Sequence, residues 1–376
     1  MITPAFFYAQ CIKNGVGFFS GVPDSLLKSF CAYITDKCHY RNHIVAVNEG
    51  AAVALGAGYH LATGKIPLVY MQNSGIGNAI NPLLSLADSD VYQIPMILVV
   101  GWRGRPGVKD EPQHIKQGKV TLETFDALKI PYAVIGSDDD ALRGQMAEAF
   151  EYIGKHSAPY AFIVEKDVFA PYTLQSSTYD NKAQMSREEA IEVAISLSNL
   201  KEAFIATTGM ASRELYETRL RLKMNSERDF LTVGSMGHCA HIALGAALAK
   251  PDVRFTCLDG DGSLLMHLGA MAAVGAKKLS NFRHILLNNC AHDSVGGQPT
   301  IAPSVNFGAL AKAVGYKEVY RAVSINDLRN ICLKTKERIE GGSIFIEVLV
   351  RKGARKNLGR PQSSPVDNKK AFMSFL

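Results

Sequence analysis

Short runs of apolar, often β-branched residues alternate along this chain with longer helix-like stretches. Apolar runs of this length, bounded by Gly, Pro or polar residues, are typical of buried parallel strands. They predict two series of strands with helices between them, and right-handed crossovers would make each series a doubly wound parallel sheet of the α/β class. The runs are Ile44–Val47, Leu68–Met71, Met96–Val100, Tyr132–Ile135 and Tyr160–Val164, then Ala203–Ala206, Arg254–Leu258, His284–Leu287 and Ile344–Val350.

A polar stretch separates the two series. Pro171–Ser186 is rich in Ser, Thr, Gln, Asn and Asp and has no apolar periodicity, which is typical of a linker. Ser186 and Glu189 then have the spacing of a capping box and predict the start of a helix. We therefore predict one domain over residues 1–170, a linker over 171–186 and a second domain over 187–376.

Composition and charge narrow the function classes. The 376 residues are 47% hydrophobic and 20% charged, enough for two cores, which excludes global disorder. The net charge of +6 is not concentrated in a stripe within the body of the chain, so a small anionic partner is favoured over nucleic acid. The seven cysteines include no C-x-x-C pair. This favours a reducing cytoplasm, and neither a signal peptide nor a membrane span is predicted.

An aspartate lies in a glycine-rich turn after one predicted strand. Arg254–Leu258 leads into Gly260, Asp261, Gly262 and Ser263, and a helix-like segment follows. Such glycines let the backbone approach a ligand, and the N–H groups at the helix start bind phosphate. A carboxylate there would repel phosphate unless a cation lay between them. Asp261 therefore predicts a divalent metal that bridges to a diphosphate.

Two asparagines, Asn288 and Asn289, follow the next predicted strand, His284–Leu287. Parallel strands end at one edge of the sheet, where such folds bind ligands, and an amide oxygen suits Mg²⁺ or Ca²⁺. Alone, a Gly-Asp-Gly turn or an Asn-Asn pair is most often an ordinary turn or loop start. Together, each after its own strand, they indicate a metal–diphosphate site.

The Gly-Asp-Gly turn and the Asn pair resemble the thiamine-diphosphate (ThDP) signature of the ThDP-dependent decarboxylase superfamily. In that superfamily the Asp, the second Asn and a backbone carbonyl two residues later hold Mg²⁺. The resemblance implies a metal site made by Asp261, Asn289 and the carbonyl group of Ala291, with Asn288 as the alternative amide.

The resemblance extends to the turn Gly234, Ser235 and Met236, which precedes a small-residue helix over 240–249. In related enzymes this turn touches the diphosphate, and its large apolar residue forces the cofactor into a V shape. Without the other motifs, a buried Met in a tight turn would be the preferred interpretation. The implied cofactor-binding residues of this half are Gly234, Ser235, Met236, Gly260, Asp261, Gly262, Ser263 and Asn289.

The first half contains the counterpart of that site. Val47–Ala52, followed by Gly56–Tyr59, resembles the pyrimidine-binding domain of the same superfamily, and Glu49 ends a predicted strand and opens a helix. The resemblance implies that Glu49 hydrogen-bonds N1′ of the aminopyrimidine. That role needs a carboxyl group in a dry pocket that can share a proton. The alternative is a solvated Glu favoured by the helix dipole.

Four further segments are similar to the phosphonopyruvate decarboxylases, whose closest sister family is the sulfopyruvate decarboxylases. The resemblance covers nearly the whole chain, whose length leaves no room for the central third domain of other members. It implies that Asp24 lines the active site and helps proton transfer. His114, His292 and Asp293 are further catalytic candidates, and Ser25, Asn73 and Ser74 are substrate-binding candidates. The segments are Phe19–Ser25, Asn73–Gly77, Asp110–His114 and Ala291–Gly297.

A basic loop follows the run that ends at Val100. Arg103, Arg105 and Lys109 are clustered there among Gly and Pro residues. Guanidinium groups suit tetrahedral oxyanions such as phosphonate or sulfonate, so we expect this loop to bind substrate; a solvated basic loop is the alternative. The basic tract Arg351–Lys356 is predicted to be a solvated tail, although it could instead close over the site.

The resemblance implies a ThDP- and Mg²⁺-dependent carbon–carbon lyase that converts 3-phosphonopyruvate to phosphonoacetaldehyde and CO₂ in phosphonate biosynthesis. Sites in this family lie between subunits, which implies a homo-oligomer of at least two chains. Three alternatives remain: a sulfopyruvate decarboxylase, an acetolactate-forming carboligase and a non-catalytic ThDP-binding protein. The missing central domain disfavours the carboligase. Retention of Glu49, Asp261 and Asn289 disfavours the non-catalytic protein.

Overall fold

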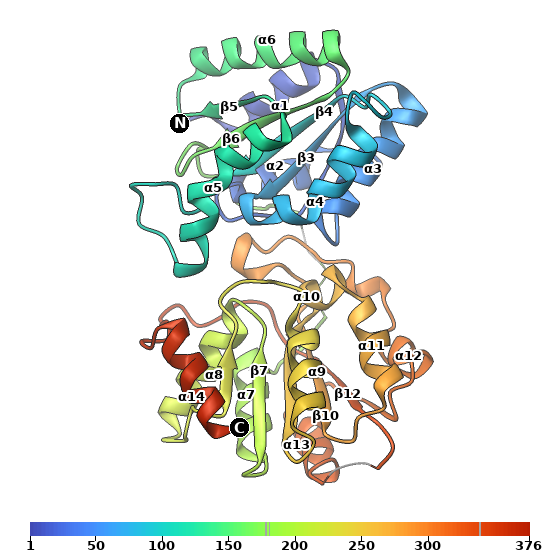
Figure 1. Ribbon diagram of the computed structural model, residues 1–376, viewed down its shortest axis with the longest axis vertical. Coiled ribbons are helices and arrows are strands. Elements are labelled where there is room, and N and C mark those ends of the chain that lie inside the picture. Colours follow the sequence, from blue (N-terminus) through green and yellow to red (C-terminus); the bar gives the residue numbers. More distant parts are fainter. Residues whose placement is uncertain (177–178, 180, 338–339) are drawn as a thin grey trace. The chain divides into compact units, whose positions relative to one another are not determined.

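The computed structural model describes residues 1–176, 179, 181–337 and 340–376. The chain divides into two units: Met1–Thr178 with His292–Gln298, and Tyr179–Ala291 with Pro299–Leu376. Within the described residues, each unit is built on its own six-stranded parallel sheet (Figure 1). The predicted fold class, two doubly wound parallel sheets, is confirmed, and no third domain is evident in the described part of the chain.

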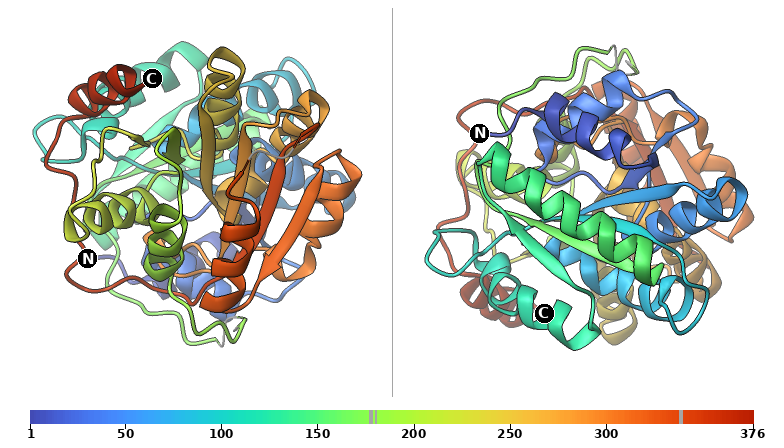
Figure 2. Two further views of the ribbon diagram at one scale, coloured as in Figure 1. Left: turned by 90° about the horizontal axis from the view of Figure 1, so that it is seen from below. Right: turned by 90° about the horizontal axis from the view of Figure 1, so that it is seen from above.

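In the first unit the strand order is β2-β1-β3-β4-β6-β5. Alternate residues of β3 face opposite sides: Leu68 and Tyr70 pack in one core with α1, α2 and α6, while Val69 and Met71 pack in another with α3, α4 and α5. Helix α6 lies over the sheet (Figure 2, right). The elements are β1 (Val16–Gly21), β2 (His43–Val45), β3 (Ile66–Gln72), β4 (Met96–Gly101), β5 (Tyr132–Ile135), β6 (Pro159–Val164), α1 (Pro4–Lys13), α2 (Lys28–Lys37), α3 (Glu49–Thr63), α4 (Ile76–Pro82), α5 (Pro112–Leu128) and α6 (Asp139–His156).

In the second unit the order is β11-β12-β10-β9-β7-β8. Leu287 of β10 pairs with Gly260 of β9, so these neighbours end level with each other. The elements are β7 (Glu202–Ala206), β8 (Asp229–Leu231), β9 (Arg254–Gly260), β10 (Phe282–Asn288), β11 (Glu318–Ala322), β12 (Ile344–Leu349), α7 (Arg187–Ser196), α8 (Met210–Arg221), α9 (Cys239–Ala249), α10 (Asp261–Met266), α11 (Gly269–Lys277), α12 (Phe307–Ala313), α13 (Ile325–Lys334) and α14 (Pro365–Phe375).

Three strands, β1, β8 and β11, were not predicted by the apolar runs. Strand β1 is interrupted by Gly17 and Ser20 although it lies inside the sheet. Strands β8 and β11 are edge strands, and they carry charged residues such as Asp229 and Arg321. Runs of apolar residues identify strands that are buried on both faces, whereas edge strands tolerate polar residues.

The segment between the sheets is partly fixed on the first unit. The Tyr172 hydroxyl and the N–H groups of Gln175 and Ser176 all donate hydrogen bonds to Asp36 of α2, at 2.8–3.0 Å. Residues 177, 178 and 180 of the predicted linker lie outside the described residues. The capping box of Ser186 and Glu189 is present and opens α7. The predicted domain limits remain a prediction. They placed His292–Gln298 in the second domain, whereas this segment belongs to the first unit.

The basic tract Arg351–Lys356 is mostly exposed, as expected of a solvated tail, but it is also anchored on the second unit. Arg355 forms ion pairs with Glu188 and Glu217, on α7 and α8. Beyond it, α14 packs against β8, where the rings of Phe372 and Phe230 lie 5.6 Å apart. The tail is therefore part of the second unit, because its cations meet carboxylates that no local sequence pattern places near them. No helix in the described ranges combines the length and the apolar character needed to cross a bilayer.

Candidate active site

The predicted metal ligands of the second unit lie at the carboxyl edge of β9 and β10. Asp261, the first residue of α10, is buried, and its carboxylate accepts a 2.5 Å hydrogen bond from Thr300. Asn289 is also buried, and its side-chain oxygen accepts the N–H of Ala291 at 3.0 Å. Buried carboxylate and amide oxygens at one edge suit a hard cation such as Mg²⁺. These residues fit the metal that ThDP requires.

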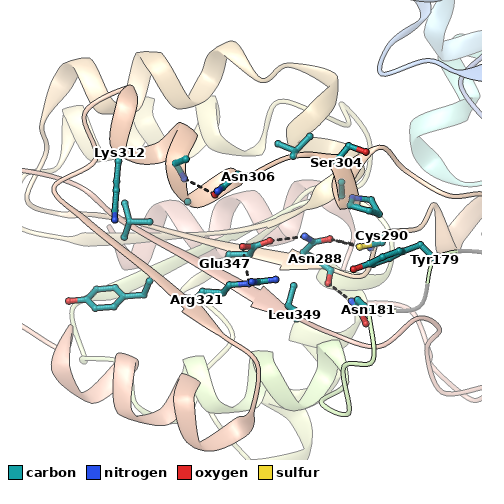
Figure 3. Close-up of a pocket in the computed structure, with 17 residues that line it drawn as sticks. Tyr179, Asn181, Asn288, Cys290, Ser304, Asn306, Lys312, Arg321, Glu347 and Leu349 are labelled. Atoms are coloured by element: carbon teal, nitrogen blue, oxygen red, sulfur yellow. Dashed lines mark hydrogen bonds and ion pairs between the residues drawn. The ribbon is translucent and has the colours of Figure 1, made fainter.

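The neighbouring Asn288 has a different role. Its amide donates to Glu347 Oε1 at 2.8 Å, and its oxygen accepts the N–H of Cys290 at 3.2 Å. Glu347 also pairs with Arg321 at 3.4 Å. Figure 3 shows this network in a pocket of about 620 Å³ that lies beside β10, β11 and β12. Both the amide and the oxygen of Asn288 are engaged in this network, so Asn289 is kept as the candidate metal ligand.

Replacing each asparagine separately should distinguish these roles. We expect Asn289→Ala to weaken Mg²⁺ binding about 10- to 100-fold, because it removes a candidate ligand, and also to lower stability, because the buried N–H of Ala291 loses its acceptor. Asn288→Ala should lower only the free energy of unfolding, by about 1–3 kcal/mol, because Glu347 loses its buried amide partner. Isothermal titration with Mg²⁺ and urea denaturation measure the two effects. An equal loss of Mg²⁺ affinity in both variants would contradict the assignment.

The turn with Met236 is tied to α10. Ser235 and Gly237 have left-handed backbone conformations, and a Cβ atom at Gly237 would lie 2.5 Å from the ring of His267. The N–H of Gly237 donates to Ser263 Oγ at 3.2 Å, and the hydroxyl of Thr207 donates to the same oxygen at 2.9 Å. Ser263 thus joins the two predicted diphosphate loops, Gly234–Met236 and Gly260–Ser263. Sequence reasoning missed Thr207, which has no motif of its own.

Glu49, the predicted catalytic carboxyl group, begins α3 in the first unit. It is 5% exposed, and its Oε2 accepts a 2.8 Å hydrogen bond from the amide of Asn78. Burial raises the pKa of Glu49 although the hydrogen bond from Asn78 opposes the shift. Asn48 caps the helix by accepting the N–H of Ala51 at 2.8 Å. The carboxyl group is therefore desolvated and fixed, as a proton-sharing group requires, and is not a solvated helix start.

The segment that covers Glu49 requires a glycine at position 75. A Cβ atom there would lie 2.4 Å from Glu49 Oε1, whereas one at Gly77 would meet open space. Gly75 ends the short helix Asn73–Gly75, and Asn78 follows in α4. Within the predicted motif Asn73–Gly77, Gly75 leaves room for the Glu49 side chain. Asn78, which holds Glu49 by a hydrogen bond, lies one residue after that motif and was not predicted.

The two glycines form a matched pair for a test. Gly75→Ala should push Glu49 out of position and lower the free energy of unfolding by about 1–3 kcal/mol, with a large loss of turnover. Gly77→Ala should keep turnover and slightly raise stability, because Ala is the better helix former. Thermal unfolding and steady-state assays of both variants measure this. Equal activity of the two variants would contradict the packing described here.

Asp24 lies at the centre of a second network in the first unit. It is fully buried, and its two oxygens accept hydrogen bonds from Gln72 Nε2 at 2.6 Å and from the N–H of Leu26 at 2.9 Å. The hydroxyl of Ser74 donates to Gln72 Oε1 at 2.7 Å. Burial raises the pKa of Asp24. An aspartate held in this way can carry a proton nearer to neutral pH than a solvated one.

The basic loop is mostly neutralised by carboxylates. Arg103 donates two hydrogen bonds to Asp110 and one, of 2.7 Å, to Ser25. Arg105 pairs with Glu165 at 2.9 Å. Among the described residues, Lys109 is the cation of this loop without a carboxylate partner. Arg103 and Ser25, both predicted to bind substrate, are thus bonded to each other, and only Lys109 is an exposed cation.

Two other predicted residues support this loop. The amide of Asn73 donates to the carbonyl of Arg103 at 2.8 Å and to Thr121 at 2.9 Å. His114 of α5 is buried, its Nδ1 has no hydrogen-bond partner, and burial lowers its pKa to about 4. Asn73 therefore holds the loop in place, and His114 is a neutral imidazole near neutral pH.

His292 and Asp293 begin the loop segment that belongs to the first unit. The N–H of His292 donates to the carbonyl of Gln298 at 2.9 Å, and its carbonyl accepts the N–H of Gly297 at 3.0 Å. Asp293 starts a single turn of 3₁₀ helix. The side-chain amide of Gln298 is buried with neither of its atoms hydrogen-bonded, a feature that sequence reasoning missed.

Known proteins resemble this chain along its whole length. Residues 3–128 match the thiamine pyrophosphate enzyme N-terminal TPP binding domain, and residues 208–348 match the C-terminal TPP binding domain. Two phosphonopyruvate decarboxylases, from Streptomyces viridochromogenes and Streptomyces hygroscopicus, are each 34% identical to it over 390 residues. The matches cover 100% of this chain and 95% and 94% of theirs.

A sulfopyruvate decarboxylase from Methanosarcina acetivorans is 27% identical over 393 residues, covering 97% of this chain and 95% of its own. The buried Glu49 of the first unit and the buried Asp261 and Asn289 of the second lie within the two matched TPP-binding regions. The chain therefore belongs to the phosphonopyruvate decarboxylase family of thiamine pyrophosphate enzymes.

Proposed function

We propose that this enzyme converts 3-phosphonopyruvate to phosphonoacetaldehyde and CO₂, with ThDP and Mg²⁺, as a step of phosphonate biosynthesis. The observation that carries the proposal is the 34% identity with two phosphonopyruvate decarboxylases over the full chain. The buried carboxyl group of Glu49 and the oxygen ligands Asp261 and Asn289 support it. They are the groups that such an enzyme needs for proton transfer and for metal binding.

Asp261, Asn289 and the carbonyl group of Ala291 would hold Mg²⁺, and the loops Gly234–Met236 and Gly260–Ser263 would hold the diphosphate. When bound, ThDP supplies the electron sink for the electron pair that is released as CO₂ leaves. Glu49 holds a proton at a carboxyl group whose raised pKa brings it closer to neutral pH. The burial of this carboxyl group excludes water from it.

The substrate would carry three acidic groups or their anions, so cations and proton donors should recognise it. Lys109 is exposed and offers an ammonium group to the phosphonate. Asp24 is buried and has a raised pKa, so it can donate a proton to the product carbon and then be protonated again by solvent. Arg103 acts indirectly by positioning Ser25 and the loop.

A substrate comparison tests the proposed function. The purified chain should release CO₂ and an aldehyde from 3-phosphonopyruvate when ThDP and Mg²⁺ are present, and neither product when either is omitted. Sulfopyruvate and pyruvate serve as parallel substrates. Release of CO₂ without ThDP would refute the proposed chemistry, and a higher kcat/KM on sulfopyruvate would refute the proposed substrate.

A sulfopyruvate decarboxylase is the second candidate. The 27% identity with the Methanosarcina enzyme over 97% of this chain favours it over other 2-oxo acid decarboxylases. Sulfonate is also a tetrahedral oxyanion, but it has one acidic group fewer than phosphonate. Values of kcat/KM for each substrate, measured both above and below the second phosphonate pKa, distinguish the two substrates, because only phosphonate changes its charge there.

We also infer that the active form contains at least two chains, with Glu49 of one chain and Asp261 of another serving one cofactor. Mixing two inactive variants tests this. Glu49→Gln and Asp261→Asn, unfolded together and refolded, should regain about a quarter of the wild-type activity, because half of randomly formed dimers are mixed and each has one intact site of two. No recovery from a well-refolded mixture would refute the inference.

A further inference from the structure

A cluster of metal-binding side chains lies in the interior of the second unit and shares no residue with the predicted Mg²⁺ ligands. Cys257 and Asp259 are two residues apart on β9 and so face the same side of the sheet. His284 of β10 pairs with Cys257 in the strand register. One ligand atom from each of these three side chains lies within 4.8 Å of the other two. Among the described residues, this is the one group of three or more His, Cys, Asp or Glu side chains so arranged.

The cluster contains polar atoms without partners. Cys257 and His284 are 0% exposed and Asp259 is 1% exposed. His284 Nε2 and Asp259 Oδ2 lie 3.6 Å apart, and neither has a hydrogen-bond partner. Leaving two such atoms unsatisfied in a dry interior is unfavourable. A bound cation between them would satisfy both.

We propose that Cys257, Asp259 and His284 bind a zinc ion, with Cys239 in the fourth position. Cys239 is the first residue of α9, which packs against β9, and its sulfur is 3.4 Å from that of Cys257. Thiolate, imidazole and carboxylate are the ligands that zinc takes in tetrahedral sites. This site is separate from the one assigned to Mg²⁺, whose ligands are all oxygen atoms.

The distances fit zinc after small movements. Bond lengths of about 2.0–2.3 Å place the ligand atoms of a tetrahedral zinc about 3.3–3.8 Å from one another. The 3.4 Å between the two sulfurs and the 3.6 Å between His284 and Asp259 are in that range. The thiolates of Cys239 and Cys257 and the carboxylate of Asp259 more than balance the two positive charges of the ion, which leaves the site with one net negative charge.

The surroundings of His284 also fit a metal ligand. Its Nδ1 lies 3.0 Å from the hydroxyl of Tyr316, which leaves Nε2 directed at Asp259. A hydrogen bond to the second ring nitrogen is what orients metal-bound histidines. Burial raises the pKa of the Cys257 thiol well above its ordinary value. Zinc uptake would therefore release two protons to solvent, one from each of the Cys257 and Cys239 thiols, as the thiolates form.

The position of the site indicates a structural role. Asp259 is two residues before Asp261, and Cys239 is three residues after Met236. A zinc ion bound to both would join the two loops that are proposed to hold the diphosphate. No ligand is more than 2% exposed, so there is no open position for substrate, which is typical of structural zinc.

Metal analysis of the full chain tests the proposal without any assay of activity. The protein is expressed with added zinc, dialysed against EDTA under native conditions and analysed by inductively coupled plasma mass spectrometry. We expect about one zinc per chain in the wild type, and less than about a tenth of that in Cys257→Ser and Asp259→Asn. Cys332→Ser, which changes another fully buried cysteine of the same unit, should keep its zinc. Wild-type protein without zinc, or zinc retained by both ligand variants, would overturn the proposal.

A spectroscopic measurement on the wild type covers the case in which the ligand variants fail to fold. The chain is unfolded with EDTA and refolded with Co²⁺, which takes the geometry of zinc and absorbs visible light. We expect the strong visible bands of tetrahedral cobalt and a thiolate-to-cobalt charge-transfer band, both abolished by one equivalent of Zn²⁺. A refolded chain without these bands would overturn the proposal.

Discussion

Glu49→Gln is expected to reduce turnover by about 10²- to 10⁴-fold at saturating ThDP and Mg²⁺, while the cofactor still binds. This range is the rate enhancement that a positioned general acid or base usually contributes. Glutamine keeps the shape of the side chain and the hydrogen bond from Asn78, but it cannot exchange a proton. Steady-state assays and titration with ThDP measure the two quantities separately. A variant with wild-type turnover would refute the role proposed for Glu49.

The matched control is Glu123→Gln, which makes the same change on α5 at an exposed position. Because that carboxylate is solvated, the control should keep both turnover and stability within experimental error. If the control lost as much activity as Glu49→Gln, the loss would reflect a general effect of removing negative charge from the first unit.

Glu49→Gln should also have a higher free energy of unfolding than the wild type at neutral pH. Burial raises the pKa of Glu49 above its value of about 4 in the unfolded chain. Stability from this group is therefore fully present below about pH 4 and is lost as the pH rises through the folded-state pKa. Glutamine carries no such penalty. Urea denaturation of both proteins from pH 3.5 to 8 should show a difference that grows with pH, and a constant difference would contradict the buried charge.

Asp261→Asn is expected to abolish ThDP binding at physiological Mg²⁺, with an increase in the apparent Kd for Mg²⁺ of about 100-fold or more. The carboxylate is the one charged ligand of the proposed metal site, and without the metal the diphosphate has no counter-ion. Calorimetric titration of each partner in the presence of the other measures the loss. Unchanged Mg²⁺ affinity would refute the assignment of this aspartate as a metal ligand.

Asp252→Asn is the matched control for that substitution. Asp252 lies in the same unit, between α9 and β9, and is exposed. It should bind Mg²⁺ and ThDP as the wild type does. Asp261→Asn should also remain folded, because Asn can still accept the hydrogen bond from Thr300. A loss of ThDP with an unchanged melting temperature would therefore report on the ligand site and not on the fold.

The sequence by itself determined the fold class and the candidate chemistry. Strands buried on both faces must be apolar throughout, so runs such as Met96–Val100 are visible without any structure. Edge strands such as β11 are free of that constraint, and they were missed. Asp261 and the pair Asn288–Asn289 were found because each follows the end of a strand, where the topology of a parallel sheet places ligand-binding groups. The role of Glu49 and the choice of Asn289 came from the resemblance to ThDP-dependent decarboxylases.

Only the tertiary structure decided which side chains are engaged with one another. Arg103 looked like a free guanidinium group, but seven residues later in the chain Asp110 holds it. Asn288 and Asn289 are adjacent residues of one type, yet the alternation of side chains directs Asn288 to Glu347 on the neighbouring strand. Such pairings depend on which strands become neighbours, and local patterns carry no information about that.

The cluster of Cys257, Asp259 and His284 is the clearest case of a contact that local sequence patterns do not predict. Its members are separated by 2 and then 25 residues along the chain, a spacing that matches no zinc motif. They come together because β9 and β10 are adjacent and in register. The sequence thus determined which groups could do chemistry at the ends of strands. The pairing of strands, set by packing of the whole sheet, decided which groups meet inside it.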